Sequence, residues 1–165
     1  MVKKTNINDV ITSILTARKN IESIMGKGKV ICEVFEIVEQ YANQDCPLLF
    51  EGETGVGKKE IIKYLHSISP RAEKELITID CSAFVETLIE SELFGVRKGA
   101  YTDAKEDRKG RIEAANGSTL FIDEINSLPK HLLPKLLRVI QEKEILRIGG
   151  NKIIPIDVRV IATTN

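Results

Sequence analysis

The chain has 165 residues, of which 42% are hydrophobic and 29% are charged, and its formal net charge is zero. This length and composition suit one globular domain with its own core, and the balanced charge argues against a simple DNA-binding module. No apolar run approaches the roughly 20 residues of a membrane helix, and no apolar stretch of a signal peptide follows the two lysines near the start. Cys32, Cys46 and Cys81 lack the spacing of metal ligands. We therefore expect a cytoplasmic protein with reduced thiols.

Residues 1–23 are largely polar and are interpreted as a linker or a short amphipathic helix, from the spacing of four apolar side chains: Val10, Ile11, Ile14 and Leu15. The rest of the chain alternates between segments of helical periodicity and short apolar segments typical of buried strands. Helices are predicted over residues 30–41, 58–69, 85–94, 111–116 and 132–144, and strands over residues 46–52, 75–80, 119–124 and 156–165.

The helical periodicity also predicts which apolar side chains face inward. They are Ile31, Val34, Phe35, Val38 and Tyr41, then Ile61, Ile62, Leu65 and Ile68, then Val85, Leu88, Ile89 and Leu93, and finally Leu133, Leu136, Leu137 and Ile140. Alternating helices and doubly apolar strands predict an α/β fold with a parallel sheet covered on both sides. Ligands of such sheets bind at the carboxyl ends of the strands, where three motifs occur.

The first motif is GETGVGKK, which follows a predicted strand and opens a predicted helix. Its residues are Gly52, Glu53, Thr54, Gly55, Val56, Gly57, Lys58 and Lys59. The glycines allow backbone N–H groups to face phosphate oxygens, Lys58 supplies a cation, and the helix start adds a positive dipole end. Lys59 stands where such loops usually carry a Ser or Thr for Mg²⁺. We predict a phosphate loop that binds ATP.

The other two motifs end the strands over residues 119–124 and 156–165. Asp123 and Glu124 put two carboxylates at the rim of the sheet, where one can hold hydrated Mg²⁺ and its neighbour can polarise the attacking water. Asn165 is a polar amide at the end of an apolar strand. It is interpreted either as a strand cap or as a group that positions a water against the terminal phosphate.

In order along the chain, Ile24-Met25-Gly26, GETGVGKK, ESELFGVRKGAYTDA, GSTLFIDEI, LLRVIQEKEILRIGG and DVRVIATTN resemble the motifs of bacterial enhancer-binding proteins, the sigma-54-dependent transcription activators of the AAA+ class. The resemblance covers residues 24–165. It implies a three-layer, Rossmann-like AAA+ P-loop core with a helix-loop-helix insertion between the second and third strands. It also implies assembly as a ring, usually a hexamer, with Mg²⁺-dependent ATP hydrolysis that remodels RNA polymerase bearing sigma-54.

The resemblance also implies roles for single residues. Asp123 and Glu124 are the magnesium and water-activating pair, Asn165 is the sensor, and Ile24 and Met25 lie near the adenine. The loop over residues 95–104 touches sigma-54, and its tip consists of Gly99, Ala100, Tyr101, Thr102, Asp103 and Ala104. An exposed Tyr101 between small residues suits an anchor for a partner.

The chain departs from the family in four places. Asp103 replaces the glycine of the family's loop, and Lys59 replaces an acid. Asp80 replaces the asparagine that hydrogen-bonds the water-activating glutamate, so an ionised Asp80 is expected to repel Glu124. The arginine fingers, second sensor, helical lid and DNA-binding domain of the family follow the sensor asparagine and are not in this sequence.

Two interpretations of the function therefore stay open. One is the ATPase domain of a sigma-54 activator, in which the chain alone hydrolyses ATP weakly. The other is an ATP-binding interaction module that has lost hydrolysis, through truncation or drift. A third, an unrelated P-loop enzyme such as a small-molecule kinase, is disfavoured by the loop over residues 95–104.

Overall fold

The computed structural model describes residue 19 and residues 29–102 and 104–165. The predicted amphipathic segment over residues 10–15, as well as Ile24, Met25 and Asp103, lies outside the described residues. The described part divides into two compact units. The helical unit contains residues 29–44 and 54–73, and the sheet unit contains residues 45–53 and 74–165.

The helical unit consists of α2 (Lys29–Ala42) and α3 (Lys58–Ser67), close to the two helices predicted there. Phe35 of α2 meets Tyr64 of α3 edge to face, with ring centroids 5.3 Å apart, and the Tyr64 hydroxyl donates to Glu39 at 2.7 Å. This pair joins the two helices with one apolar and one polar contact, because a buried tyrosine hydroxyl needs an acceptor.

Most of the inward positions predicted for these helices are correct. Phe35, Val38, Ile61, Ile62 and Leu65 are buried. Tyr41 is wrong, because it is 36% exposed near the end of α2. Ile31, Val34 and Ile68, the residue that caps α3, are only half-buried.

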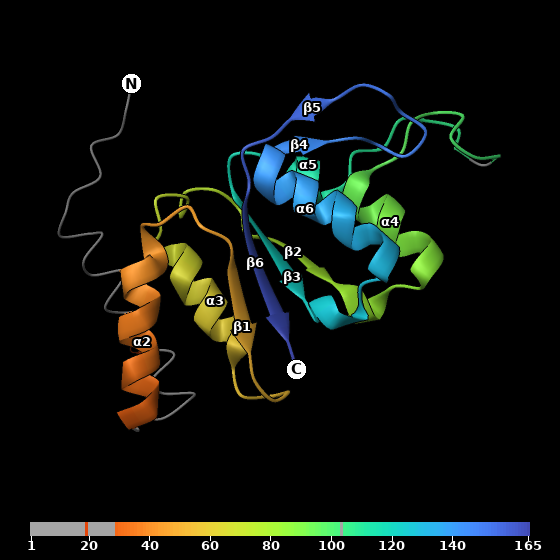
Figure 1. Cartoon of the computed structure of the whole chain (residues 1–165). Coiled ribbons are helices and arrows are strands. Elements are labelled where there is room, and N and C mark those ends of the chain that lie inside the picture. The colour runs from red at the N-terminus through yellow and green to blue at the C-terminus, as the bar shows by residue number, and fades with distance from the viewer. Residues whose placement is uncertain (1–18, 20–28, 103) are drawn as a thin grey trace, which may run out of the picture. The chain divides into compact units, whose positions relative to one another are not determined.

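The sheet unit is built on four described strands, all parallel, in the order β1-β6-β3-β2 (Figure 1). They are β1 (Leu48–Glu51), β2 (Ile77–Asp80), β3 (Thr119–Asp123) and β6 (Arg159–Thr164). All five residues of β3 are buried, as expected for a central parallel strand. The predicted α/β class with a parallel sheet is confirmed, although β6 begins three residues later than predicted.

Between β2 and β3 the chain forms η1 (Cys81–Ala83), α4 (Glu86–Phe94), a loop and the short α5 (Arg111–Ala114). The predicted helix-loop-helix insertion between the second and third strands is therefore present. After β3 follow η2 (Ile125–Ser127), η3 (Lys130–Leu132), α6 (Leu133–Glu142) and an antiparallel pair, β4 (Glu144–Ile145) and β5 (Ile154–Pro155). The β4–β5 pair was not predicted, and α6 ends two residues earlier than predicted because Lys143 adopts a left-handed conformation.

The core of the sheet unit lies between α4, α5 and α6 and one face of the sheet (Figure 1). Ile89, Leu93 and Phe94 of α4 pack in one cluster with Leu136 and Val139 of α6 and with the alternate strand residues Ile79, Leu120, Ile122, Val160 and Ala162. An ion pair between Glu90 and Lys135 and a contact between Glu86 and His131 at 3.7 Å link α4 to the segment containing α6.

Four inward positions predicted for this unit are wrong. Val85, Leu88, Leu133 and Leu137 are 62%, 53%, 44% and 50% exposed. For Leu133 and Leu137, the reason is that each follows another leucine, at the start of α6 and within it. Leu132 and Leu136 lie four residues apart and face the core, so Leu133 and Leu137, one position further round the helix, face outward. Periodicity alone did not decide which member of each pair would be buried.

Candidate functional site

The carboxyl ends of the four parallel strands lie along one edge of the sheet. The register pairs Asp80 with Asp123 and Glu51 with Thr164, and the Gly52 N–H donates to the Thr164 carbonyl at 3.3 Å. The structure therefore brings the start of the glycine-rich loop, the acidic end of β3 and the end of β6 to the same edge. This is where parallel α/β sheets bind ligands.

Thr163 of β6 links this strand to β3 at this edge. Its buried hydroxyl donates to Asp123 Oδ1 at 2.5 Å and accepts from the Glu124 backbone N–H at 3.1 Å. One side chain thus orients the carboxylate of Asp123 and the backbone of Glu124 together. Thr163 was not among the predicted site residues. The sequence does carry a signal for it, because a hydroxyl in a largely apolar strand must find a hydrogen-bond partner when it is buried.

Glu124 leaves the strand with a left-handed backbone, at φ 50° and ψ 55°. A non-glycine residue in this region is uncommon and costs conformational energy. The N–H bond to Thr163 holds that conformation, and η2 begins at the next residue. The half-buried Glu124 side chain is thus presented beyond the end of β3 and does not continue the strand's alternation.

Asp80 ends β2 and caps η1. Its Oδ1 accepts from the Ser82 backbone N–H at 3.0 Å and from the Ser82 hydroxyl at 2.6 Å. The predicted repulsion between Asp80 and Glu124 stays a prediction. The carboxylate has a local role that the sequence did not indicate, as a side-chain cap of the turn after β2.

Cys81 lies among the carboxylates of this edge. Burial, followed by the negative charges of Asp80, Asp123 and Glu124, raises the pKa of its thiol from 9.0 to about 12. The thiol is 2% exposed. Because all three carboxylates act on one sulfur atom, the edge is a region of concentrated negative charge that suits a cation.

The glycine-rich loop connects β1 to α3 in the predicted strand-loop-helix order. Gly55 and Gly57 have φ of 86° and 90°, the left-handed region that glycine adopts without strain. The Gly57 carbonyl accepts from the N–H groups of Glu60 and Ile61 at 3.0 and 3.2 Å, so α3 starts directly after it with Lys58 as its first residue. Open space surrounds the position of a Cβ at Gly55. These features fit backbone contacts to phosphate.

The loop between α4 and α5 is held at its base by backbone hydrogen bonds. Val96 and Arg108 exchange two N–H···O bonds of 2.8 Å, and Arg97 donates to the Ile148 carbonyl at 3.0 Å. Ile148 in turn donates to the Gly95 carbonyl at 3.0 Å. The base of the loop is thus a short three-stranded arrangement that includes a segment from the connection between β4 and β5.

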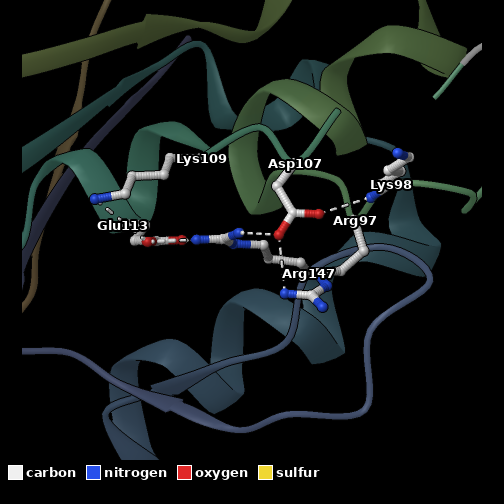
Figure 2. Close-up of polar contacts among 6 residues, drawn as sticks. All are labelled: Arg97, Lys98, Asp107, Lys109, Glu113 and Arg147. Carbon is white, nitrogen blue, oxygen red and sulfur yellow. Dashed lines mark hydrogen bonds and ion pairs between the residues drawn. The ribbon is translucent and has the colours of Figure 1, made fainter. Parts of the chain in front are cut away.

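Asp107 ties this base together through its side chain. Its carboxylate accepts from the Lys98 backbone N–H at 2.8 Å and pairs with the guanidinium groups of Arg97 and Arg147 at 2.9 and 3.5 Å (Figure 2). The Lys98 hydrogen bond, followed by the charges of Arg97, Arg147 and Lys98, holds the pKa of Asp107 below its ordinary value. Arg147 also makes a two-pronged contact with Glu113 of α5, at 2.7 and 2.8 Å.

The tip of the loop contains the predicted partner residues. Gly99 donates to the Ala104 carbonyl at 2.8 Å, and Ala104 donates to the Tyr101 carbonyl at 3.0 Å. Tyr101 is 50% exposed and Thr102 is exposed, which confirms the predicted exposure of the tyrosine. An aromatic side chain on a folded-back turn with a fixed base is a suitable anchor for a protein partner.

Residues 24–165 match the family described as the sigma-54 interaction domain. The DNA-binding transcriptional activator HyfR of Escherichia coli is 46% identical over 158 residues, which are 96% of this chain and 24% of HyfR. A structure of NtrX from Brucella abortus has a TM-score of 0.77 at 28% identity and covers 93% of this chain and 33% of NtrX. This likeness confirms the predicted α/β fold of the AAA+ core.

A second NtrX structure, in complex with ATP, has a TM-score of 0.77 at 23% identity, with 99% of this chain and 37% of NtrX covered. The chain thus spans about a quarter of HyfR and about a third of NtrX. None of the described helices combines the length and the apolar character that crossing a bilayer requires.

We predict that Thr163→Val destabilises the protein by about 1–3 kcal/mol, because it leaves the Glu124 N–H without its acceptor and removes a donor to Asp123. Thr163→Ser keeps the hydroxyl and serves as the control. Urea denaturation of the three proteins measures the difference. Equal stability of the Val and Ser variants would show that the hydroxyl contributes nothing.

We predict that Cys81 resists thiol reagents in the folded protein at pH 8. A pKa of about 12 in place of 9.0 lowers its thiolate fraction about a thousandfold, and its sulfur is buried. Half-buried Cys32 and Cys46 provide the internal comparison. Mass spectrometry after brief alkylation should find Cys81 unmodified until denaturant is added. Rapid modification of Cys81 in the native protein contradicts the prediction.

Proposed function

Because the chain belongs to the sigma-54 interaction domain family, we propose that it is the ATP-binding and ATP-hydrolysing domain of a sigma-54-dependent transcriptional regulator that remodels RNA polymerase holoenzyme. The observation that carries the proposal is the shared carboxyl edge of the sheet. There the glycine-rich loop begins at Gly52, and the acidic end of β3 lies two strands away in the order β1-β6-β3. HyfR is itself described as a transcriptional activator.

For ATP, the donors come from the loop and from the start of α3. The left-handed backbone at Gly55 and Gly57 is suited to presenting N–H groups to phosphate oxygens, and Lys58, the first residue of the ten-residue α3, would add a charge for the β- and γ-phosphates. The NtrX fold is known with ATP bound, which is consistent with this role. Ile24 and Met25 are proposed to lie near the adenine.

For Mg²⁺, the oxygen-rich donors at the end of β3 fit a hard cation, with Asp123 as its carboxylate. Among the described residues no cluster of three metal-ligating side chains exists, so the ion would share its ligands with nucleotide phosphates and water, as Mg²⁺ usually does. When bound, Mg²⁺ supplies positive charge against the phosphates. Thr163 fixes the orientation of Asp123 for that contact.

For hydrolysis, we propose that Glu124 polarises the attacking water and that Asn165 positions this water against the terminal phosphate. The left-handed backbone of Glu124 moves its carboxylate off the strand, where a base that orients a water is needed. The isolated chain is expected to hydrolyse ATP weakly, since an arginine finger from a neighbouring subunit is worth about 10³–10⁵ in rate in comparable reactions.

For the partner, we propose that Tyr101 and Thr102 at the exposed loop tip contact sigma-54. Asp103 is expected to weaken the contact, because a charge must be desolvated against the partner. The full-length protein is proposed to act as a ring, usually a hexamer, and to bind DNA through a separate domain. No membrane partner is proposed.

A module that binds ATP without hydrolysing it is the second candidate. The charges of Asp80, Asp123 and Glu124 all raise the pKa of Cys81, so three carboxylates share one small region. At about 4 Å, two like charges repel by about 4 kcal/mol at an effective dielectric of 20. Such repulsion would oppose the proposed role of Glu124 at the attacking water.

We predict that Lys58→Ala lowers the affinity for ATP by about 1.5–3 kcal/mol, which is the worth of a charge-assisted contact to phosphate. Isothermal titration calorimetry with Mg²⁺ and ATP measures the change. Lys63→Ala, on an exposed position of the same helix, is the matched control and should bind as the parent does. The proposed nucleotide site fails if both variants bind ATP equally well.

We predict that Asp80→Asn speeds ATP hydrolysis near neutral pH and flattens its pH dependence, because it removes one carboxylate and keeps an oxygen for the Ser82 cap. Ser82→Ala keeps the charge, loses the hydroxyl contact and should not speed hydrolysis. Single-turnover assays between pH 6 and 9 compare the three proteins. If Asp80→Asn is no faster than its parent, repulsion at Asp80 does not limit the reaction.

A further inference from the structure

We call the loop over residues 95–104 the partner loop. We propose that a cavity beside it binds an acidic side chain of sigma-54, on the same sigma-54 segment that Tyr101 contacts. The cavity has a volume of about 490 Å³ and lies between Arg97 and Lys98 at the loop base and the residues 149–155 that lead into β5. The inference rests on the proposed function, because it assigns a second contact to the proposed sigma-54 partner.

The walls of the cavity are fixed by the backbone. Arg97 donates to Ile148, and Ile148 donates to Gly95, so the two sides are hydrogen-bonded to each other. A Cβ on Gly149 would lie 2.4 Å from the Ala100 Cβ, so only glycine allows this approach of the two segments. A site with such walls is pre-formed, and binding there need not order a loose loop.

The lining of the cavity is cationic. It contains Arg97, Lys98, Arg147 and Lys152 against one acid, Glu113. The two arginines are already paired, with Asp107 and Glu113 (Figure 2). The ammonium groups of Lys98 and Lys152 make no ion pair with any residue that the structure describes. Two cations beside neutralised arginines leave a positive site with room for a carboxylate.

The rest of the lining favours a peptide over a nucleic acid. Ile153 is 48% exposed, and Ile154 and Pro155 complete an apolar side of the cavity. A peptide can offer one acidic side chain next to apolar ones, whereas a chain of phosphates offers nothing for this apolar side. The partner segment is therefore expected to pair apolar residues, one of them against Tyr101, with an aspartate or glutamate against Lys98 and Lys152.

The test compares binding of purified sigma-54 by fluorescence anisotropy, with Mg²⁺, ADP and a transition-state mimic of the phosphate. The double variant Lys98→Gln, Lys152→Gln removes both ammonium groups. The Lys98 backbone N–H, which donates to Asp107, is unchanged by the substitution. The control variant Lys63→Gln, Lys130→Gln removes the same charge from exposed positions outside the cavity. Tyr101→Ala tests the loop tip separately.

We expect the cavity variant to bind sigma-54 about tenfold more weakly than the control at low salt, with a smaller loss of affinity as salt rises, because the lost contact is ionic. ATP affinity should be the same in both. Equal sigma-54 affinity of cavity variant and control, while Tyr101→Ala weakens binding, overturns the inference and leaves the proposed function standing. Weaker binding of duplex DNA but not of sigma-54 also overturns it and assigns the cavity to nucleic acid. If the parent chain does not bind sigma-54, the proposed function fails and the inference fails with it.

Discussion

The parallel pairing of β3 with β2 on one side and β6 on the other is the constraint on which the candidate site depends. Asp80 is level with Asp123 across one ladder, and Ile122 is level with Ala162 across the other, which brings Asp123 level with Thr163. A slip of one residue between β3 and β6 would turn alternate side chains to the opposite face. The hydroxyl of Thr163 would then lose both Asp123 and Glu124. In this register the apolar residues Leu120 and Ile122 pack under α4 and α6.

The partner loop depends on a second, independent constraint. Its position is set at the base, where Val96 is bridged to Arg108 and to Ile148. Asp107 adds an ionic contact that joins the loop to Arg147, and Arg147 continues to Glu113 of α5. A displacement of α5 or of the segment after β4 would therefore move the loop through these ion pairs and backbone hydrogen bonds. The exposed pair of Arg97 with Asp107 contributes little stability, so its role here is geometric.

The sequence predicted the strands, the glycine-rich turn and the acidic strand end because each is a local pattern that one physical requirement dictates. It did not predict the contact of Thr163 with Asp123, since pairing register joins residues 40 positions apart. Nor could it choose between Leu132 and Leu133, or between Leu136 and Leu137, because both members of each pair satisfy the same periodicity. The β4–β5 pair has strands of only two residues, too short for an alternation to be recognised.

At Asp80 the requirement of the turn and the charge of the sheet edge can be considered separately. As the cap of η1 it needs an oxygen that accepts from the Ser82 N–H, and aspartate and asparagine both provide one. Folding therefore places no strong demand on which of the two stands at this position. The two residues differ in charge, and the affected groups are the neighbouring carboxylates and the thiol of Cys81, whose pKa is already raised. A substitution that is neutral for the turn can thus change the charge at the edge of the sheet without altering the structure around it.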